Sequence, residues 1–187
     1  MRVEEAILRS LQRVWKERAG LQFCALFVVW LGGLALLFEL LRMSLVDFYM
    51  YPLSYAAAWL LTGLGIDARL GEALLATGVC QLAVHDIVYL VTFECTGIFA
   101  LLMCLAAVLA YPASLADKAK GVALVLPAFI VYSTLRLTIM GLVARFVPAQ
   151  IELFHVYIMV LVNIGFVLFL WMYWVREVVV VERREIP

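Results

Sequence analysis

Long apolar runs, separated by short polar stretches, dominate the hydropathy pattern of the chain. A helix that crosses the ~30 Å hydrocarbon core of a bilayer needs about 20 predominantly apolar residues. Four runs approach or exceed this length: residues 21–41, 95–112, 121–146 and 155–174. The pattern therefore predicts an all-α integral membrane protein with about four transmembrane helices.

Residues 1–20 have a different pattern, in which charges of both signs interrupt the apolar positions. They lack the continuous apolar core that a signal peptide contains. Their apolar positions recur at helical spacing and share one face: Val3, Ile7, Leu11, Val14 and Trp15. We therefore expect an N-terminal amphipathic helix that lies on the membrane surface.

The segment 42–94 begins with a short apolar run. Residues 51–66 are too few for a span, while Pro52 suits a first helical turn and Gly63 and Gly65 suit a helix end. We expect a small helix at the membrane interface. A spanning helix at 51–66 is the alternative, and it would reverse the orientation of one half of the chain.

Two β-rich runs follow, "GVCQLAV" at 78–84 and "IVYLVTFE" at 87–94, with only His85 and Asp86 between them. Two such runs with a two-residue gap are typical of a β-hairpin. The His-Asp pair is not among the Gly- or Asn-containing pairs that hairpin turns favour. A hairpin here would lead the chain directly to Cys95.

The composition supports the membrane interpretation, because hydrophobic residues make up 67% of the 187-residue chain and the mean hydropathy is +1.06. Average proteins are about 45–50% apolar, and a soluble core of this length could not bury the excess. The formal net charge is zero, which gives no indication of a nucleic-acid partner. We interpret residues 1–187 as a single membrane domain.

Lys and Arg residues indicate how the chain crosses the membrane. Five of them precede residue 21, two lie in the loop at 113–120 and three follow residue 174. Four spans would place all of these on one side, which the positive-inside rule identifies as the cytoplasm. Both termini are then cytoplasmic, and residues 42–94 are extracytoplasmic.

This orientation brings three chemically capable residues to the extracytoplasmic ends of neighbouring helices. Cys95 begins the second span, Arg136 lies in the outer half of the third, and His155 begins the fourth. A charge within a span costs about 2.5–3.5 kcal/mol on insertion scales and usually marks function. Snorkelling of Arg136 to the interface is the structural alternative.

These three residue types fit nucleophilic catalysis. A thiol at a helix N-terminus has a lowered pKa, an imidazole can act as base and then as acid, and a guanidinium in a low-dielectric pocket can stabilise an oxyanion. Glu94 opposes the first effect, because a neighbouring carboxylate raises the pKa of a thiol. That opposition would disappear if Glu94 pointed away or paired with Arg136 or Arg145.

The four cysteines show no C-x-x-C motif and no spacing typical of metal ligands. Cys24 and Cys104 lie in predicted spans, where we interpret them as small packing residues. Cys80 would reach Cys95 only if their segments pair, so a disulfide between them stays open. We expect no metal ion and no cofactor.

Three motifs, "ECTGI" at 94–98, "STLR" at 133–136 and "FH" at 154–155, resemble those of the exosortase/archaeosortase family of membrane cysteine transpeptidases. Their order on consecutive spans matches the family pattern, and the similarity covers roughly residues 50–175. Ser133 stands where family members often carry Asn.

The resemblance implies a cysteine peptidase and transpeptidase in the cytoplasmic (inner) membrane of a prokaryote, with its active site on the extracytoplasmic side. Cys95 would be the nucleophile that forms a thioester, and His155 the general acid and base. Arg136 would stabilise the oxyanion or orient the thiolate. Other residues of the motifs are candidates for supporting roles: Glu94, Thr96, Gly97 and Ser133.

The partners implied by the resemblance are exported proteins with a C-terminal sorting signal, made of a short motif, a transmembrane helix and a basic tail. The enzyme would cleave near the motif and transfer the protein to an acceptor. The sequence leaves two other classes open. One is a non-catalytic membrane scaffold or assembly protein, and the other is a membrane subunit in which His85 and His155 bind a metal or haem.

Overall fold

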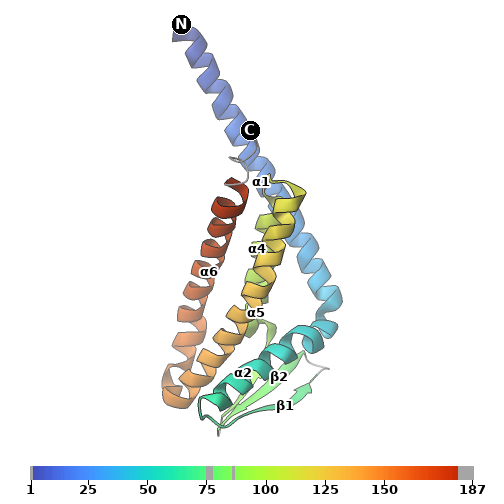
Figure 1. Cartoon of the computed structure of the whole chain (residues 1–187), viewed down its shortest axis with the longest axis vertical. Helices are drawn as coiled ribbons and strands as arrows, with labels where there is room; N and C mark the ends of the chain where they lie inside the picture. The colour runs from blue at the N-terminus through green and yellow to red at the C-terminus, as the bar shows by residue number, and fades with distance from the viewer. Residues whose placement is uncertain (1, 75–77, 86, 181–187) are drawn as a thin grey trace.

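The computed structural model describes residues 2–74, 78–85 and 87–180 of the chain. Most of these residues are helical, and a small three-stranded antiparallel sheet lies at one end of the helices (Figure 1). Three helical stretches are long and apolar enough to cross a membrane: Arg18–Gly63, Leu115–Phe146 and Leu153–Val179. The prediction of a mainly helical protein with long apolar helices is therefore confirmed.

The second predicted span is shorter in the structure than the sequence pattern indicates. Helix α4, Ile98–Ala110, contains 13 residues, which corresponds to about 20 Å of helix. This is less than the ~30 Å of a hydrocarbon core. The structure thus contains three helices of spanning length and, within the described residues, one shorter apolar helix.

The N-terminal part of the chain is one continuous helical stretch. Helix α1, Arg2–Leu45, passes the predicted boundary at residue 20 without a break. It continues through a π-helical turn, η1 (Val46–Met50), into α2 (Tyr51–Gly63), and the chain changes direction sharply there (Figure 1). The small helix predicted after α1 is therefore present. The apolar face predicted for the N-terminus involves side chains outside the described part.

The β-hairpin predicted from the sequence is confirmed. Strands β2 (Val79–Val84) and β3 (Ile87–Val91) pair antiparallel, with Val84 opposite Ile87 next to the turn. His85 has φ +53°, so it adopts the left-handed conformation that Gly or Asn usually supplies in such turns. Asp86 lies outside the described residues.

A third strand, β1 (Ala68–Leu74), was not predicted and pairs antiparallel with β2. Its register shifts between Leu70 and Ala73. A Cβ at Gly71 would lie 2.9 Å from the Cβ of Gln81, which shows how closely the two strands approach. The inward face of β2 packs on α2 and η1, and the end of β3 at Val91 and the following Phe93 lie in the same core.

Helix α5, Leu115–Phe146, contacts α2, α4 and the C-terminal helix. It begins earlier than the predicted residue 121, because Ser114 caps it. The Ser114 Oγ accepts a hydrogen bond from the backbone N–H of Asp117 at 3.1 Å. This long helix runs toward the end of the bundle that bears the sheet (Figure 1), and the buried Ser133 and Arg136 lie in its second half.

The C-terminal helix consists of η4 (Leu153–Ile158), α6 (Met159–Trp174) and η5 (Val175–Val180). Trp174 is fully buried between this helix and the start of α5, and its Nε1 donates a hydrogen bond to the carbonyl of Asp117 at 3.0 Å. The opposite end of the helix, with His155 in η4, lies near the sheet.

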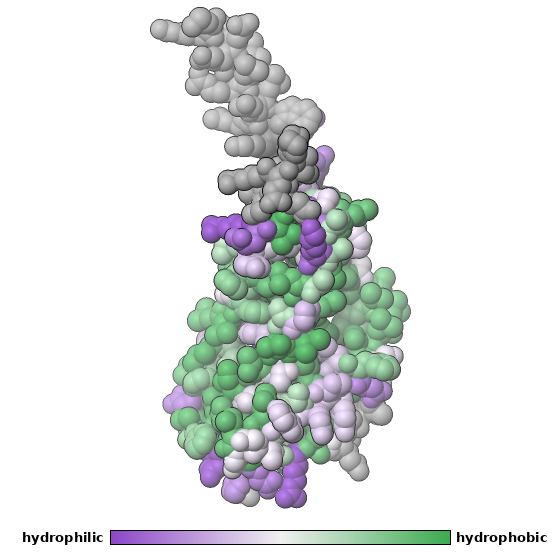
Figure 2. Space-filling view, in the orientation of Figure 1, coloured by the Kyte–Doolittle hydropathy of each residue, from purple (hydrophilic) through white to green (hydrophobic). Residues whose placement is uncertain are grey.

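The outer surface of the helices is largely apolar. Figure 2 shows hydrophobic residues over the middle of the molecule and hydrophilic residues gathered near the two ends of this region. Large apolar side chains there are open to the surroundings, with exposed fractions of 66% at Val28, 74% at Leu40 and 70% at Leu161.

Candidate active site

Cys95 lies in a single helical turn, α3 (Phe93–Thr96), between β3 and α4. Gly97 follows with φ +75°, and this left-handed residue separates α3 from α4. The expectation that Cys95 begins the second long helix is therefore wrong, and the dipole of α4 starts beyond the thiol. The Cys95 side chain is partly exposed, and its Sγ lies 3.5 Å from the Oγ1 of Thr92.

The turn that carries Cys95 is fixed to α5 by hydrogen bonds. The buried Ser133 Oγ donates to the backbone carbonyl of Thr96 at 2.6 Å. The hydroxyl of Tyr49, which belongs to η1, lies 3.2 Å from the same Oγ. Thr96 closes the turn itself by donating from Oγ1 to the carbonyl of Phe93 at 2.7 Å. These bonds of Thr96 and Ser133 hold the turn that carries Cys95, and Tyr49 is a contributor that the sequence did not reveal.

Arg136 is buried in the bundle, with only 5% of its surface exposed. It therefore does not snorkel to the molecular surface. Its guanidinium lies against Gly97, because a Cβ built on that glycine would be 3.2 Å from Nη1. The Nε atom is buried without a hydrogen-bond partner, and none of the described carboxylates pairs with this cation.

His155 lies in the π-helical turn η4 and is partly buried. The charged side chains close enough to act on its ring are Arg136 and Glu94. The structure thus brings the His155 imidazole, the Arg136 guanidinium and the turn of Cys95 into one region, although they come from three different elements. This agrees with the convergence expected from the sequence.

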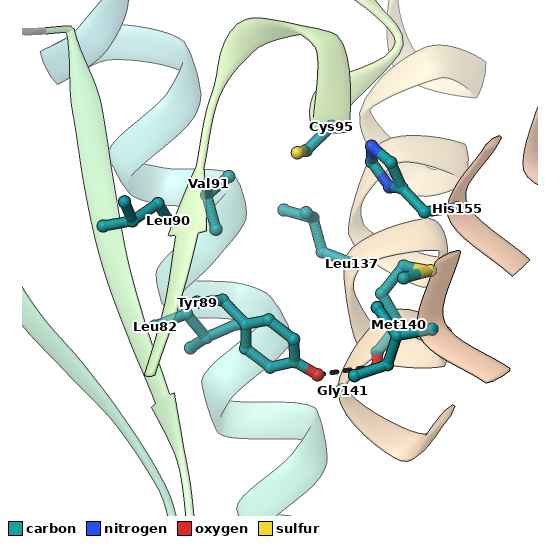
Figure 3. Close-up of a pocket in the computed structure, with 10 residues that line it drawn as sticks. Leu82, Tyr89, Leu90, Val91, Cys95, Leu137, Met140, Gly141 and His155 are labelled. Carbon is teal, nitrogen blue, oxygen red and sulfur yellow. Dashed lines mark hydrogen bonds between the residues drawn. The ribbon is translucent and has the colours of Figure 1, made fainter. Parts of the chain in front are cut away.

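Cys95 and His155 also line one cavity of about 190 Å³ between the sheet, α5 and the C-terminal helix. Figure 3 shows the two side chains beside each other at one end of this cavity, with the Cys95 sulfur turned toward Val91. The remaining lining is mostly apolar: Leu82, Tyr89, Leu90, Val91, Leu137, Met140, Gly141 and Ile151. Such a lining suits an apolar side chain of a ligand next to the thiol.

Tyr89 closes the other end of the cavity. Its hydroxyl donates a hydrogen bond to the backbone carbonyl of Met140 at 2.9 Å, and so joins β3 to α5 (Figure 3). Burial raises the pKa of Tyr89 to about 12, which keeps this hydroxyl protonated at neutral pH. Tyr89 therefore acts here as a donor that holds the cavity wall in place.

The other residues near the thiol differ in their exposure. Glu94 points outward and is exposed, and within the described ranges it forms no ion pair with Arg136 or Arg145. Cys80 is buried on β2, where burial raises the pKa of its thiol. All four cysteines are free, so the disulfide that the sequence left open is absent.

The two histidines occupy different places. His85 forms the turn between β2 and β3, whereas His155 lines the cavity beside Cys95, and His85 is not among the residues that line it. Among the residues that the structure describes, no three His, Cys, Asp or Glu side chains come close enough together to hold a metal ion.

Asn163 and Tyr132 are neighbours of this region that the sequence analysis missed. A Cβ at Gly97 would lie 3.6 Å from Asn163 Oδ1 and 3.7 Å from Tyr132 Cε1. Both residues lie within apolar helical segments, and no periodicity or motif distinguishes them from their neighbours in the sequence. The only signal was the amide of Asn163 inside an otherwise apolar run.

Comparison of the chain with protein-family models, with curated proteins and with solved structures finds no match. The functional argument therefore depends on the residues and their geometry.

Proposed function

We propose that the protein is a membrane-embedded cysteine peptidase and transpeptidase of the exosortase type. The observation that carries this proposal is the shared cavity of Cys95 and His155, with a buried, unpaired Arg136 beside the same turn. A thiol, an imidazole and a guanidinium are sufficient for acyl transfer through a thioester.

A membrane location is supported by the apolar outer surface of the long helices (Figure 2). Side chains such as Leu40 and Leu161 are more than two-thirds exposed, and contact with lipid would remove this apolar area from water. We infer about four crossings of a prokaryotic cytoplasmic membrane, with both termini cytoplasmic and the Cys95 cavity on the extracytoplasmic side. In this arrangement the short α4 extends its crossing through Gly97 and the turn of Cys95.

The reaction begins when His155 accepts the proton of the Cys95 thiol. The thiolate attacks the carbonyl carbon of the scissile peptide, and the new C–S bond places a negative charge on the carbonyl oxygen. Arg136 stabilises this oxyanion. His155 returns its proton to the amide nitrogen, the C–N bond breaks and a thioester remains. An acceptor nucleophile then attacks the thioester carbonyl while His155 accepts its proton, the C–S bond breaks and the sulfur leaves as thiolate.

The proposed substrates are exported proteins that end in a short motif, a transmembrane helix and a basic tail. The mostly apolar lining of the cavity supports recognition of an apolar side chain next to the scissile bond. The transmembrane helix of the substrate would hold that bond at the membrane surface.

The decisive experiment compares Cys95→Ala with Cys104→Ala in host membranes. Cys104 is a buried thiol of α4 and provides the matched control. We expect Cys95→Ala to abolish cleavage of such an exported protein, while expression and membrane insertion stay normal, and Cys104→Ala to retain cleavage. Normal cleavage by Cys95→Ala would overturn the proposal and favour a non-catalytic scaffold.

A further inference from the structure

Three side chains that approach Gly97 each carry a buried polar atom without a partner. Arg136 Nε, Tyr132 Oη and Asn163 Oδ1 are each buried, and none has a hydrogen-bond partner in the described part of the chain. Burying a polar group without a partner costs about 1–3 kcal/mol, and more for a charged group. Three such groups in one place therefore indicate that a ligand supplies the missing partners.

The three side chains are held in place by their own helices. Tyr132 and Arg136 are four residues apart on α5 and so share one face. The Tyr132 ring stacks on Phe166 of α6, with ring centroids 4.3 Å apart and an angle of 9° between the planes. This stacking joins α5 to the helix that carries Asn163.

The chemistry of the three atoms defines the ligand. A guanidinium offers only donors, whereas the Oδ1 of an asparagine is an acceptor. A ligand must therefore present an acceptor to Arg136 and a donor to Asn163. A peptide amide does this, because its carbonyl accepts and its N–H donates.

We propose that Arg136, Asn163 and Tyr132 form a subsite for a backbone amide of the substrate, and that Asn163 is a positioning residue for the reaction at Cys95. This inference rests on the proposed function. The substrate chain extends from the Cys95 cavity toward Gly97, where the missing side chain lets Arg136 and Asn163 approach the backbone closely.

Access to the subsite exists from the outer surface of the helices. Asn163 also lines an apolar groove of about 420 Å³ between α1, α4 and α6, together with residues such as Phe27, Met103 and Trp171. The groove brings a ligand to the side chain of Asn163, whose Oδ1 itself is buried on the side of Gly97.

The test uses two alkylating probes that differ in one group. N-octyl iodoacetamide carries an amide N–H behind the reacting carbon, and octyl iodoacetate carries an ester oxygen in its place. With either probe, the Cys95 thiolate forms a C–S bond and iodide leaves. At each cysteine, the alkylation rate with the amide probe is divided by the rate with the ester probe. The ratio at Cys95 is then divided by the ratio at the exposed Cys24 of the same sample. The resulting normalised ratio measures recognition of the N–H.

We expect this normalised ratio to exceed one by about two- to tenfold in the native chain, since one hydrogen bond supplies an effect of this size. It should fall to one in Asn163→Leu and in the wild-type chain denatured in detergent. Gly165→Ala is the matched control on the same helix, because a Cβ there meets nothing within 4 Å, and it should keep the native ratio.

Two results would overturn the subsite in different ways. A native ratio of one, or a raised ratio that Asn163→Leu leaves unchanged, would show that only water fills the space, while Cys95 could still be the nucleophile. Failure of both probes to modify Cys95 while Cys24 reacts would remove the nucleophile and the subsite together. If Asn163→Leu does not fold, the comparison of native with denatured wild-type chain still shows whether the raised ratio depends on the folded structure.

Discussion

The Ser133 Oγ donates a 2.6 Å hydrogen bond to the backbone carbonyl of Thr96, and this bond joins the turn of Cys95 to the helix of Arg136. The contact links two residues separated by 37 positions in the chain. It is buried, so water cannot replace the lost partner when one side is removed.

Substitution Ser133→Ala should therefore loosen the turn. We expect a loss of about 1 kcal/mol in stability, as for a typical buried hydrogen bond, together with slower alkylation of Cys95. Thermal unfolding in detergent and mass spectrometry of the alkylated peptides measure the two effects. Tyr49→Phe is the comparison, because it removes only the outer hydroxyl at 3.2 Å and should have the smaller effect. An unchanged Ser133→Ala chain would show that the bond does not position the turn.

Substitution Gly97→Ala should impair the site strongly. The glycine has φ +75°, which costs another residue about 1–2 kcal/mol, and the added Cβ would lie 3.2 Å from the Arg136 guanidinium. We expect at least a tenfold loss of substrate cleavage in host membranes. Gly63→Ala, at a glycine where a Cβ meets nothing within 4 Å, should retain cleavage.

Substitution Arg136→Met should separate stability from function. The guanidinium is buried without an ion pair among the described residues, so an apolar side chain of similar length removes a desolvation cost. We expect a melting temperature equal to or above that of the wild type, with cleavage abolished. A clearly lowered melting temperature would mean that the arginine is required for folding.

The thiols of Cys95 and Cys80 should differ in their reactivity, because Cys95 is partly exposed and Cys80 is buried. Burial raises the pKa of Cys80, so its thiolate fraction at pH 8 is smaller than that of an ordinary cysteine. In the folded chain we expect N-ethylmaleimide to modify Cys95 first, and Cys80 only as the pH rises above 9. Denaturation should equalise the two rates, and mass spectrometry of the two peptides follows them separately. Equal rates in the folded chain would contradict the buried position of Cys80.

The parts of the fold that depend on local pattern were predictable from the sequence. The long apolar helices, the helix after Pro52 and the hairpin around His85 follow from hydropathy, capping residues and strand alternation. Strand β1 was missed because Arg69, Gly71 and Glu72 obscure its alternation, and it forms through pairing with β2. The continuity of α1 through Gly20 was missed because a change of composition does not break a helix.

The candidate site was predictable only in part. The topology placed Cys95, Arg136 and His155 near one another, and the structure agrees. The break at Gly97 could not be foreseen, because Gly also occurs within apolar helices. The roles of Tyr49 and Asn163 depend on contacts across helices, which leave no trace in the order of residues along one helix.

The hydrogen bond from Ser133 is accepted by the main-chain oxygen of Thr96, and this determines which of the two positions tolerates mutation. Every residue at position 96 offers the same carbonyl, so no mutation of that side chain removes the acceptor. Position 133, in contrast, must encode a donor. Asn is also a donor, and it often stands at this position in the family that the sequence motifs resemble. This bond therefore constrains only the codon of residue 133, whereas residue 96 is constrained through its own hydrogen bond from Oγ1 to the carbonyl of Phe93.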